Sequence, residues 1–239
     1  MGAATRQQEV LEELRQRIRR IERRPARREG ILPSGRPEVD ARLPGGGFPR
    51  GGLAELAGGP ASGKTGVALS ALREAQAGGA LAAYVDGRGE LYPPAAAEMG
   101  VDLERLLVVR PGVQRRGAEG AAAGVAGRGR PGEALPGLWA AEALLASGAF
   151  AAVAIDVPLR GVPAARAEAM LRRLRAAAEK GGAVALWLAP PDGPRLPAAL
   201  RLEIGGPEGA AAGRPGRVRM ARAGCPGASP HGDGGGHAA

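Results

Sequence analysis

Residues 52–65 read Gly-Leu-Ala-Glu-Leu-Ala-Gly-Gly-Pro-Ala-Ser-Gly-Lys-Thr, an apolar run that leads directly into a glycine-rich turn. The second part of this stretch, residues 58–65, fits the pattern G-x-x-x-x-G-K-[ST]. The apolar run predicts a strand over 52–57, and the small apolar residues after the turn predict a helix over 65–77. At such a corner, backbone N–H groups and the positive end of the helix face the same volume, where they can hold a phosphate. The stretch therefore predicts a phosphate-binding loop.

The candidate loop residues differ in the role that we expect of each. Lys64 would reach the β- and γ-phosphates of a nucleoside triphosphate, and Thr65 would ligate Mg²⁺. The alternative is a plain glycine turn with a solvated lysine, because a chain with 41 glycines can match the pattern by chance. The flanking strand and helix favour the first interpretation, so ATP and Mg²⁺ are the expected cofactors. The nucleotide would contact Gly58, Gly59, Pro60, Ala61, Ser62, Gly63, Lys64 and Thr65.

A second apolar run, residues 149–156, predicts a buried strand that ends in Asp156. A carboxylate at a strand end is what a phosphate-bound Mg²⁺ needs to hold its water shell. An unpaired buried carboxylate is costly, so a metal-linked role explains Asp156 better than packing does. The alternative is that Asp156 caps a helix or strand. We expect Asp156 and Thr65 to hold Mg²⁺, Asp156 through water.

The rest of the chain alternates strands with helices. Strands are expected at 80–86, 106–109 and 183–189, helices at 95–99, 138–146 and 163–180, and a closing antiparallel pair at 200–204 and 217–221. Glycine and proline in 31–50 favour turns over regular structure. The fold class is therefore α/β, with a mostly parallel twisted sheet and helices on both faces.

The domain boundaries follow from composition. Residues 1–30 predict an amphipathic basic N-terminal helix, whose apolar stripe packs either on its own domain or on another subunit, and consists of Leu11, Leu14, Ile18 and Ile21. Residues 31–223 would form the nucleotide-binding core, with a Gly/Arg-rich loop at 112–137. Residues 224–239, which include Cys225, predict a disordered tail.

Charge and hydropathy narrow the function classes. A net charge of +9 and a pI near 11.1 favour a polyanionic partner such as single-stranded DNA, although an arginine-rich genome would give similar values. No stretch has the length and hydropathy of a membrane helix, and the N-terminus lacks the apolar run of a signal peptide, so we expect a cytoplasmic protein. A single cysteine excludes a disulfide framework within one chain.

Several segments resemble bacterial RecA in order and spacing, over roughly residues 31–189 and more faintly over 200–222. The resemblance is carried by Ile31-Leu-Pro-Ser-Gly35, Gly46-Gly-Phe-Pro-Arg-Gly51, the phosphate loop, Tyr84-Val-Asp86 and Met99-Gly-Val-Asp-Leu103. It implies a RecA-like P-loop NTPase core. In RecA the residue two beyond the strand-end aspartate is the catalytic glutamate, but that position here is Arg88, and a cation cannot take a proton from water. Glu90 is the nearby candidate for a catalytic base, and whether the chain is an enzyme stays open.

The segment Leu43-Pro-Gly-Gly-Gly-Phe-Pro-Arg-Gly-Gly-Leu-Ala-Glu-Leu56 resembles the ImuA family more closely. This resemblance implies an ATP-binding accessory protein of DNA repair and SOS-type damage tolerance, an adaptor in translesion synthesis with weak or no hydrolysis. Its partners would be an ImuB-like polymerase-related protein, RecA, or a second copy of the chain through the N-terminal helix. One alternative is a DNA-dependent ATPase or recombinase paralogue of RecA, in which Glu90 is the base and DNA phosphates are held by Arg115, Arg116, Arg128 and Arg130. Another is an interaction scaffold that binds no nucleotide.

Overall fold

The computed structural model describes residues 30–111, 134–159, 161–193, 200–205 and 218–222. Three expectations concern residues outside these ranges: the N-terminal helix, most of the Gly/Arg-rich loop with its arginines, and the tail with Cys225.

Strands and helices alternate along the described residues. The strands are β1 (Ile31–Leu32), β2 (Phe48–Pro49), β3 (Leu53–Ala57), β4 (Leu81–Asp86), β5 (Leu106–Val109), β6 (Phe150–Asp156), β7 (Val184–Ala189), β8 (Leu200–Ile204) and β9 (Val218–Arg222). The α-helices are α2 (Pro37–Asp40), α3 (Lys64–Ala77), α4 (Pro93–Glu98), α5 (Ala134–Ser147) and α6 (Ala164–Gly181), and the 3₁₀ turns are η1 (Pro44–Gly46) and η2 (Leu103–Arg105).

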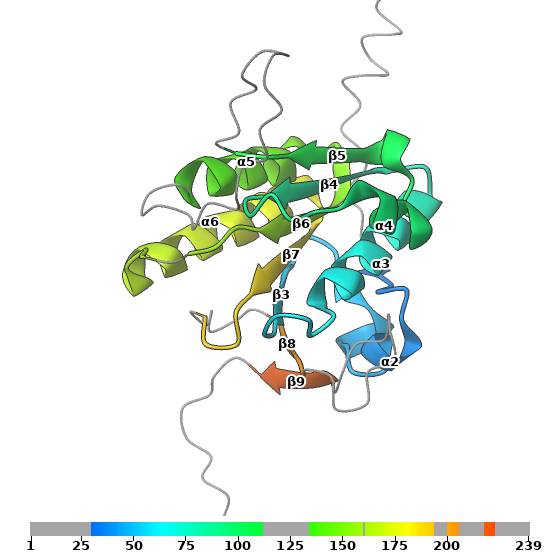
Figure 1. Ribbon diagram of the computed structural model, residues 1–239, viewed down its shortest axis with the longest axis horizontal. Helices are drawn as coiled ribbons and strands as arrows, with labels where there is room; N and C mark the ends of the chain where they lie inside the picture. Colours follow the sequence, from blue (N-terminus) through cyan, green and yellow to red (C-terminus); the bar gives the residue numbers. More distant parts are fainter. Residues whose placement is uncertain (1–29, 112–133, 160, 194–199, 206–217, 223–239) are drawn as a thin grey trace, which may run out of the picture.

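The central sheet has seven strands in the order β5-β4-β6-β7-β3-β8-β9 (Figure 1). All neighbouring pairs are parallel except β8 and β9, which pair antiparallel as the sequence predicts. Parallel strands point the same way, so the carboxyl ends of β3, β4 and β6 meet at one edge of the sheet. This edge brings the segments after Ala57, Asp86 and Asp156 to the same side of the molecule.

Helices cover both faces of the sheet, which confirms the predicted α/β class. On one face α3 packs through Val67, Ala68 and Leu72 against inward residues of the strands. On the other face α5 and α6 pack side by side, with Leu145 and Leu171 fully buried beneath them (Figure 1). None of the described helices is long and apolar enough to cross a membrane.

Two local expectations differ from the structure. Residues 31–50 contain more than turns: α2 forms, and β1 pairs antiparallel with β2 through Leu32 and Phe48. Both side chains are almost fully buried, so packing on the core rather than local propensity orders this segment. The loop expected over 112–137 ends earlier, because α5 begins at Ala134. Pro136 lies in the first turn of α5, where a missing N–H costs nothing.

Candidate functional site

The segment 58–63 connects β3 to α3 and forms the expected strand-to-helix corner. Its first N–H, that of Gly58, donates to the carbonyl oxygen of Ala189 at 3.1 Å and so fixes the loop to the end of β7. Gly63, the residue before α3, has φ +89°, a conformation that favours glycine. Ala61 has φ +56°, which is uncommon for a residue with a side chain and is typical of ligand-binding turns.

The loop is closely packed at its base. A Cβ on Gly58 would collide with the side chain of Ser62 and lie 2.7 Å from the carbonyl oxygen of Ile204. The Ser62 hydroxyl is buried and has no hydrogen-bond partner among the described residues. A buried hydroxyl is rarely left without a partner, so its orphaned state fits a group that binds here and accepts or donates a hydrogen bond. The hydroxyl of Ser62 would be available to a phosphate bound by this loop.

Lys64 is the first residue of α3, and its ammonium folds back over the loop. Its Nζ donates to the carbonyl oxygens of Gly58 at 2.9 Å and Gly59 at 3.1 Å. Burial lowers the pKa of Lys64; among the nearby charges Asp156 raises this pKa, and Arg88 lowers it. The charges of both side chains thus act on the ammonium, and a shared role of Lys64 and Asp156 toward a ligand stays a prediction.

Asp156 is the last residue of β6, and its carboxylate has a partner on each oxygen. Its Oδ1 accepts from Nε of Arg88 at 2.8 Å, and its Oδ2 accepts from the hydroxyl of Tyr84 at 3.4 Å. Burial raises the pKa of Asp156, while the hydrogen bond and charge of Arg88 act in the opposite direction. Burial also raises the pKa of Tyr84, so the phenol keeps the proton that it donates. The carboxylate is thus held by the protein itself, an arrangement that sequence reasoning did not foresee.

Glu90, the candidate base, lies in the turn that follows β4. Its backbone N–H donates to Oδ1 of Asp86 at 3.0 Å, and the next N–H, that of Leu91, donates to Oδ2 at 3.2 Å. Arg110 adds an ion pair to Asp86 at 2.9 Å. The Glu90 carboxylate raises the pKa of Lys64, so it too acts on the phosphate loop. Asp86 therefore orders the turn that carries Arg88 and Glu90, a role its place at a strand end could have suggested.

Thr65, the expected Mg²⁺ ligand, is the second residue of α3 and adjoins Lys64. Within the described ranges, no three His, Cys, Asp or Glu side chains gather into a metal site. Mg²⁺ commonly binds through one or two protein oxygens together with nucleotide phosphates. The two expected donors, the hydroxyl of Thr65 and the carboxylate of Asp156, would suit a metal that arrives with a nucleotide rather than a resident ion.

Comparison with known proteins finds similarity to RecA over part of the chain. The RecA N-terminal domain family matches residues 15–124. The matched region contains the phosphate loop, Arg88 and Glu90, and it ends before Asp156.

Individual RecA proteins also match part of the chain. RecA of Picosynechococcus sp. is 48% identical over 80 residues, which is 34% of this chain and 23% of that protein. RecA of Lactobacillus delbrueckii subsp. bulgaricus is 36% identical over 137 residues, 57% of this chain and 35% of that protein. RecA of Enterococcus gallinarum is 37% identical over 134 residues, 56% of this chain and 33% of that protein. The matched segments thus span between 23% and 35% of the length of these three proteins.

Proposed function

We propose, from the premise that the chain is a RecA-like protein, that it binds ATP at the loop 58–65 and acts in DNA repair. Its role would be that of an accessory protein in damage tolerance, like the ImuA proteins that the segment 43–56 resembles. It would hydrolyse ATP weakly or not at all. The residues that would face a Mg²⁺ accompanying the nucleotide are Thr65 and, through water, Asp156.

One observation carries this proposal: intact phosphate-binding groups lie beside an arginine instead of a catalytic glutamate. Lys64 and the tight loop supply what is needed to bind a triphosphate. Arg88 occupies the position at which a RecA-type enzyme would keep its base, and it is paired with Asp156. A guanidinium keeps its proton at neutral pH and so cannot activate water. Binding without efficient turnover follows.

The partners belong to the same proposal. Residues 1–30 would contact an ImuB-like polymerase-related protein, RecA or a second copy of the chain, because their apolar stripe needs a surface to cover. The net charge of +9 would favour single-stranded DNA through its phosphates. A cytoplasmic location is consistent with these partners.

A DNA-dependent ATPase is the second candidate, because the charge of Glu90 acts on Lys64. Glu90 could then serve as the base in place of the missing glutamate. Its backbone N–H is bonded to the strand-end Asp86, which fixes the turn on which it stands. In this alternative Glu90→Gln would abolish turnover and leave ATP binding intact.

ATP turnover by the full chain, with and without single-stranded DNA, tests the proposal. RecA of Enterococcus gallinarum is the positive control, and the Lys64→Ala variant sets the background. We expect turnover at least about 100-fold below that of the control protein, because general-base catalysis is worth about 10² or more. DNA-stimulated turnover near that of the control, lost in Glu90→Gln, would replace the accessory role with the ATPase.

A further inference from the structure

Asp156 carries a charge that the protein already compensates. Its side chain is 8% exposed, whereas that of Arg88 is 34% exposed, so the ion pair reaches from a buried carboxylate toward solvent. The second carboxylate oxygen accepts from Tyr84. Both oxygens through which a hydrated metal would be held are therefore engaged by side chains of this chain.

The backbone holds Arg88 where it can make this contact. Gly87 donates its N–H to the carbonyl oxygen of Asp156 at 2.9 Å, which ties the turn after β4 to the end of β6. A Cβ on Gly87 would lie 3.0 Å from that same oxygen, so the close approach favours glycine. The next glycine, Gly89, has φ +70°, which turns the chain away after Arg88. The backbone of Arg88 is thus held at the end of β4, and its side chain reaches from there to the end of β6.

Arg88 also belongs to the electrostatic surroundings of the phosphate loop. The charges that act on Lys64 are Asp156, Arg88 and Glu90. A cation that arrives with a nucleotide would compete with Arg88 for Asp156. The guanidinium has the advantage, because it is already attached to the chain and loses no translational entropy when it binds. The attraction that Asp156 offers to a second cation is correspondingly smaller.

We propose that Arg88 is a built-in counter-cation that competes with Mg²⁺ for Asp156 and thereby makes nucleotide affinity largely independent of Mg²⁺. This inference rests on the proposed nucleotide binding at the loop 58–65. Arg88 would then contribute to nucleotide binding, in addition to standing where a RecA-type enzyme has its catalytic base. Arg88 is a positioning residue here, because it acts through Asp156.

The ratio of the ATP dissociation constants in EDTA and in Mg²⁺ tests this proposal in the full chain. For the native sequence we expect a ratio below about 10. This means that Mg²⁺ changes the free energy of ATP binding by less than about 1.4 kcal/mol. In Arg88→Gln the unpaired carboxylate repels free ATP and attracts the metal, so the ratio should rise at least about tenfold. The double variant Arg88→Gln/Asp156→Asn should return it to the native value.

Arg110→Gln is the matched control, because it also removes an arginine from a strand-end aspartate, Asp86, on the neighbouring strand. Its ratio should equal that of the native chain. An equal rise in Arg88→Gln and Arg110→Gln would overturn the proposal, as would a native ratio that Arg88→Gln leaves unchanged. Thermal unfolding of each variant verifies that it folds.

Asp156→Asn gives a second test if Arg88→Gln does not fold. The proposal expects tighter ATP binding in EDTA, because the substitution frees Arg88 for the phosphates. Weaker binding in Mg²⁺ by tenfold or more, with no change in EDTA, would show that the metal relies on Asp156 and would overturn the inference. A native chain that binds no ATP in either condition would instead overturn the proposed function itself.

Discussion

Asp86 and Asp156 end neighbouring parallel strands in register, and each is paired with an arginine. The two pairs do different things. The Asp86 side chain is fully buried and accepts hydrogen bonds from two backbone N–H groups of the following turn. The ion pair with Arg110 therefore completes a set of contacts that orders this turn. Asp156 and Arg88 are among the charges that act on the pKa of Lys64, and we propose that Arg88 offsets the charge of Asp156 at the candidate nucleotide site. The same chemistry at adjacent strand ends therefore orders a turn in one case and, in our proposal, serves the nucleotide site in the other.

The pH dependence of stability should depend on Arg88. Burial raises the pKa of Asp156 above its ordinary 3.8, so between 3.8 and the raised value the carboxyl is protonated in the folded chain and ionised in the unfolded chain. Stability therefore falls as pH rises through this window. Arg88→Gln removes the interaction that opposes the shift and widens the window. Arg88 is a third exposed, so we expect the variant to lose about 1 kcal/mol more at about pH 7 than at about pH 4.

Urea unfolding of the native chain and of Arg88→Gln across this pH range measures the effect. Arg110→Gln provides the comparison for a general loss of charge. A cost of Arg88→Gln that is the same at both ends of the range would contradict the assigned ionisation of Asp156.

Two glycines of the phosphate loop should differ in how much an alanine substitution destabilises the fold. A Cβ on Gly58 meets the Ser62 side chain and the carbonyl oxygen of Ile204, whereas a Cβ on Gly59 has nothing within 4 Å. We expect Gly58→Ala to lower the free energy of unfolding by about 1 to 3 kcal/mol, the usual cost of overpacking. Gly59→Ala should change it by less than about 0.5 kcal/mol. Equal effects in chemical denaturation would mean that the loop is not packed as described.

A buried ion pair joins the neighbouring strands β3 and β8 of the sheet. Arg201 on β8 lies opposite Glu55 on β3, contacts its Oε1 at 2.5 Å, and each side chain is 2% exposed. Arg201→Met removes the guanidinium and leaves the Glu55 charge buried, which should cost about 3 to 5 kcal/mol. The double variant Glu55→Met/Arg201→Met should recover most of that loss in urea unfolding. If the double variant is less stable than the single one, the ion pair is not the source of the cost.

Much of the sheet could be predicted from the sequence, because the strands β3, β4, β6 and β7 are apolar runs bounded by glycine, proline or aspartate. The antiparallel β8–β9 pair was also predicted correctly. The two-residue strands β1 and β2 could not be, because only burial of Leu32 and Phe48 in the core orders them. Helix α5 begins earlier than expected because Pro136 and Gly137, which usually signal a loop, fit its first turn.

The candidate site was predictable in its parts and not in its contacts. The loop pattern and the strand-end position of Asp156 are local signals. The pairing of Asp156 with Arg88 joins residues 68 positions apart, and that of Glu55 with Arg201 joins residues 146 apart. Such pairs depend on strand order, which composition and periodicity do not specify. The roles of Lys64, Thr65, Asp156 and Glu90 toward a ligand stay predictions.

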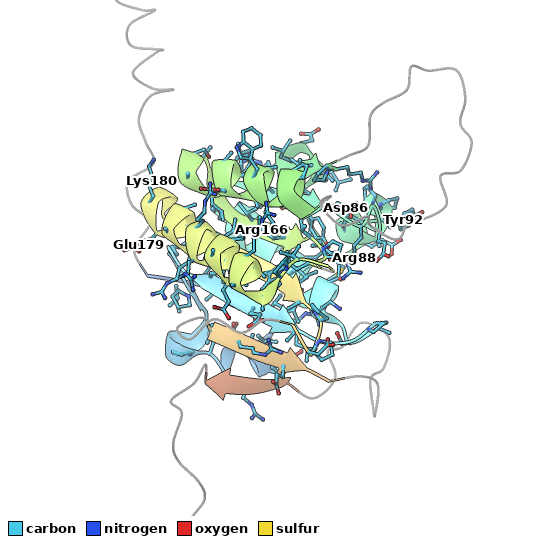
Figure 2. The ribbon with its side chains drawn as sticks, turned by 90° about the vertical axis from the view of Figure 1, so that its left-hand side faces the viewer. Asp86, Arg88, Tyr92, Arg166, Glu179 and Lys180 are labelled. Atoms are coloured by element: carbon cyan, nitrogen blue, oxygen red, sulfur yellow. The ribbon has the colours of Figure 1, made fainter. Side chains whose placement is uncertain are left out.

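The central claim, that the loop around Lys64 holds a triphosphate, is tested most directly by thermal unfolding with ATP. Lys180, the only other lysine of the chain, is the matched control. It lies in the last turn of α6, just before β7 begins, at the opposite edge of the sheet from Arg88 (Figure 2). ATP at about 100 times its dissociation constant should stabilise the native chain and Lys180→Ala by about 2.7 kcal/mol, roughly 5 to 10 °C in Tm. Lys64→Ala should show no rise; an equal rise in Lys64→Ala, or none in the native chain, would contradict the claim.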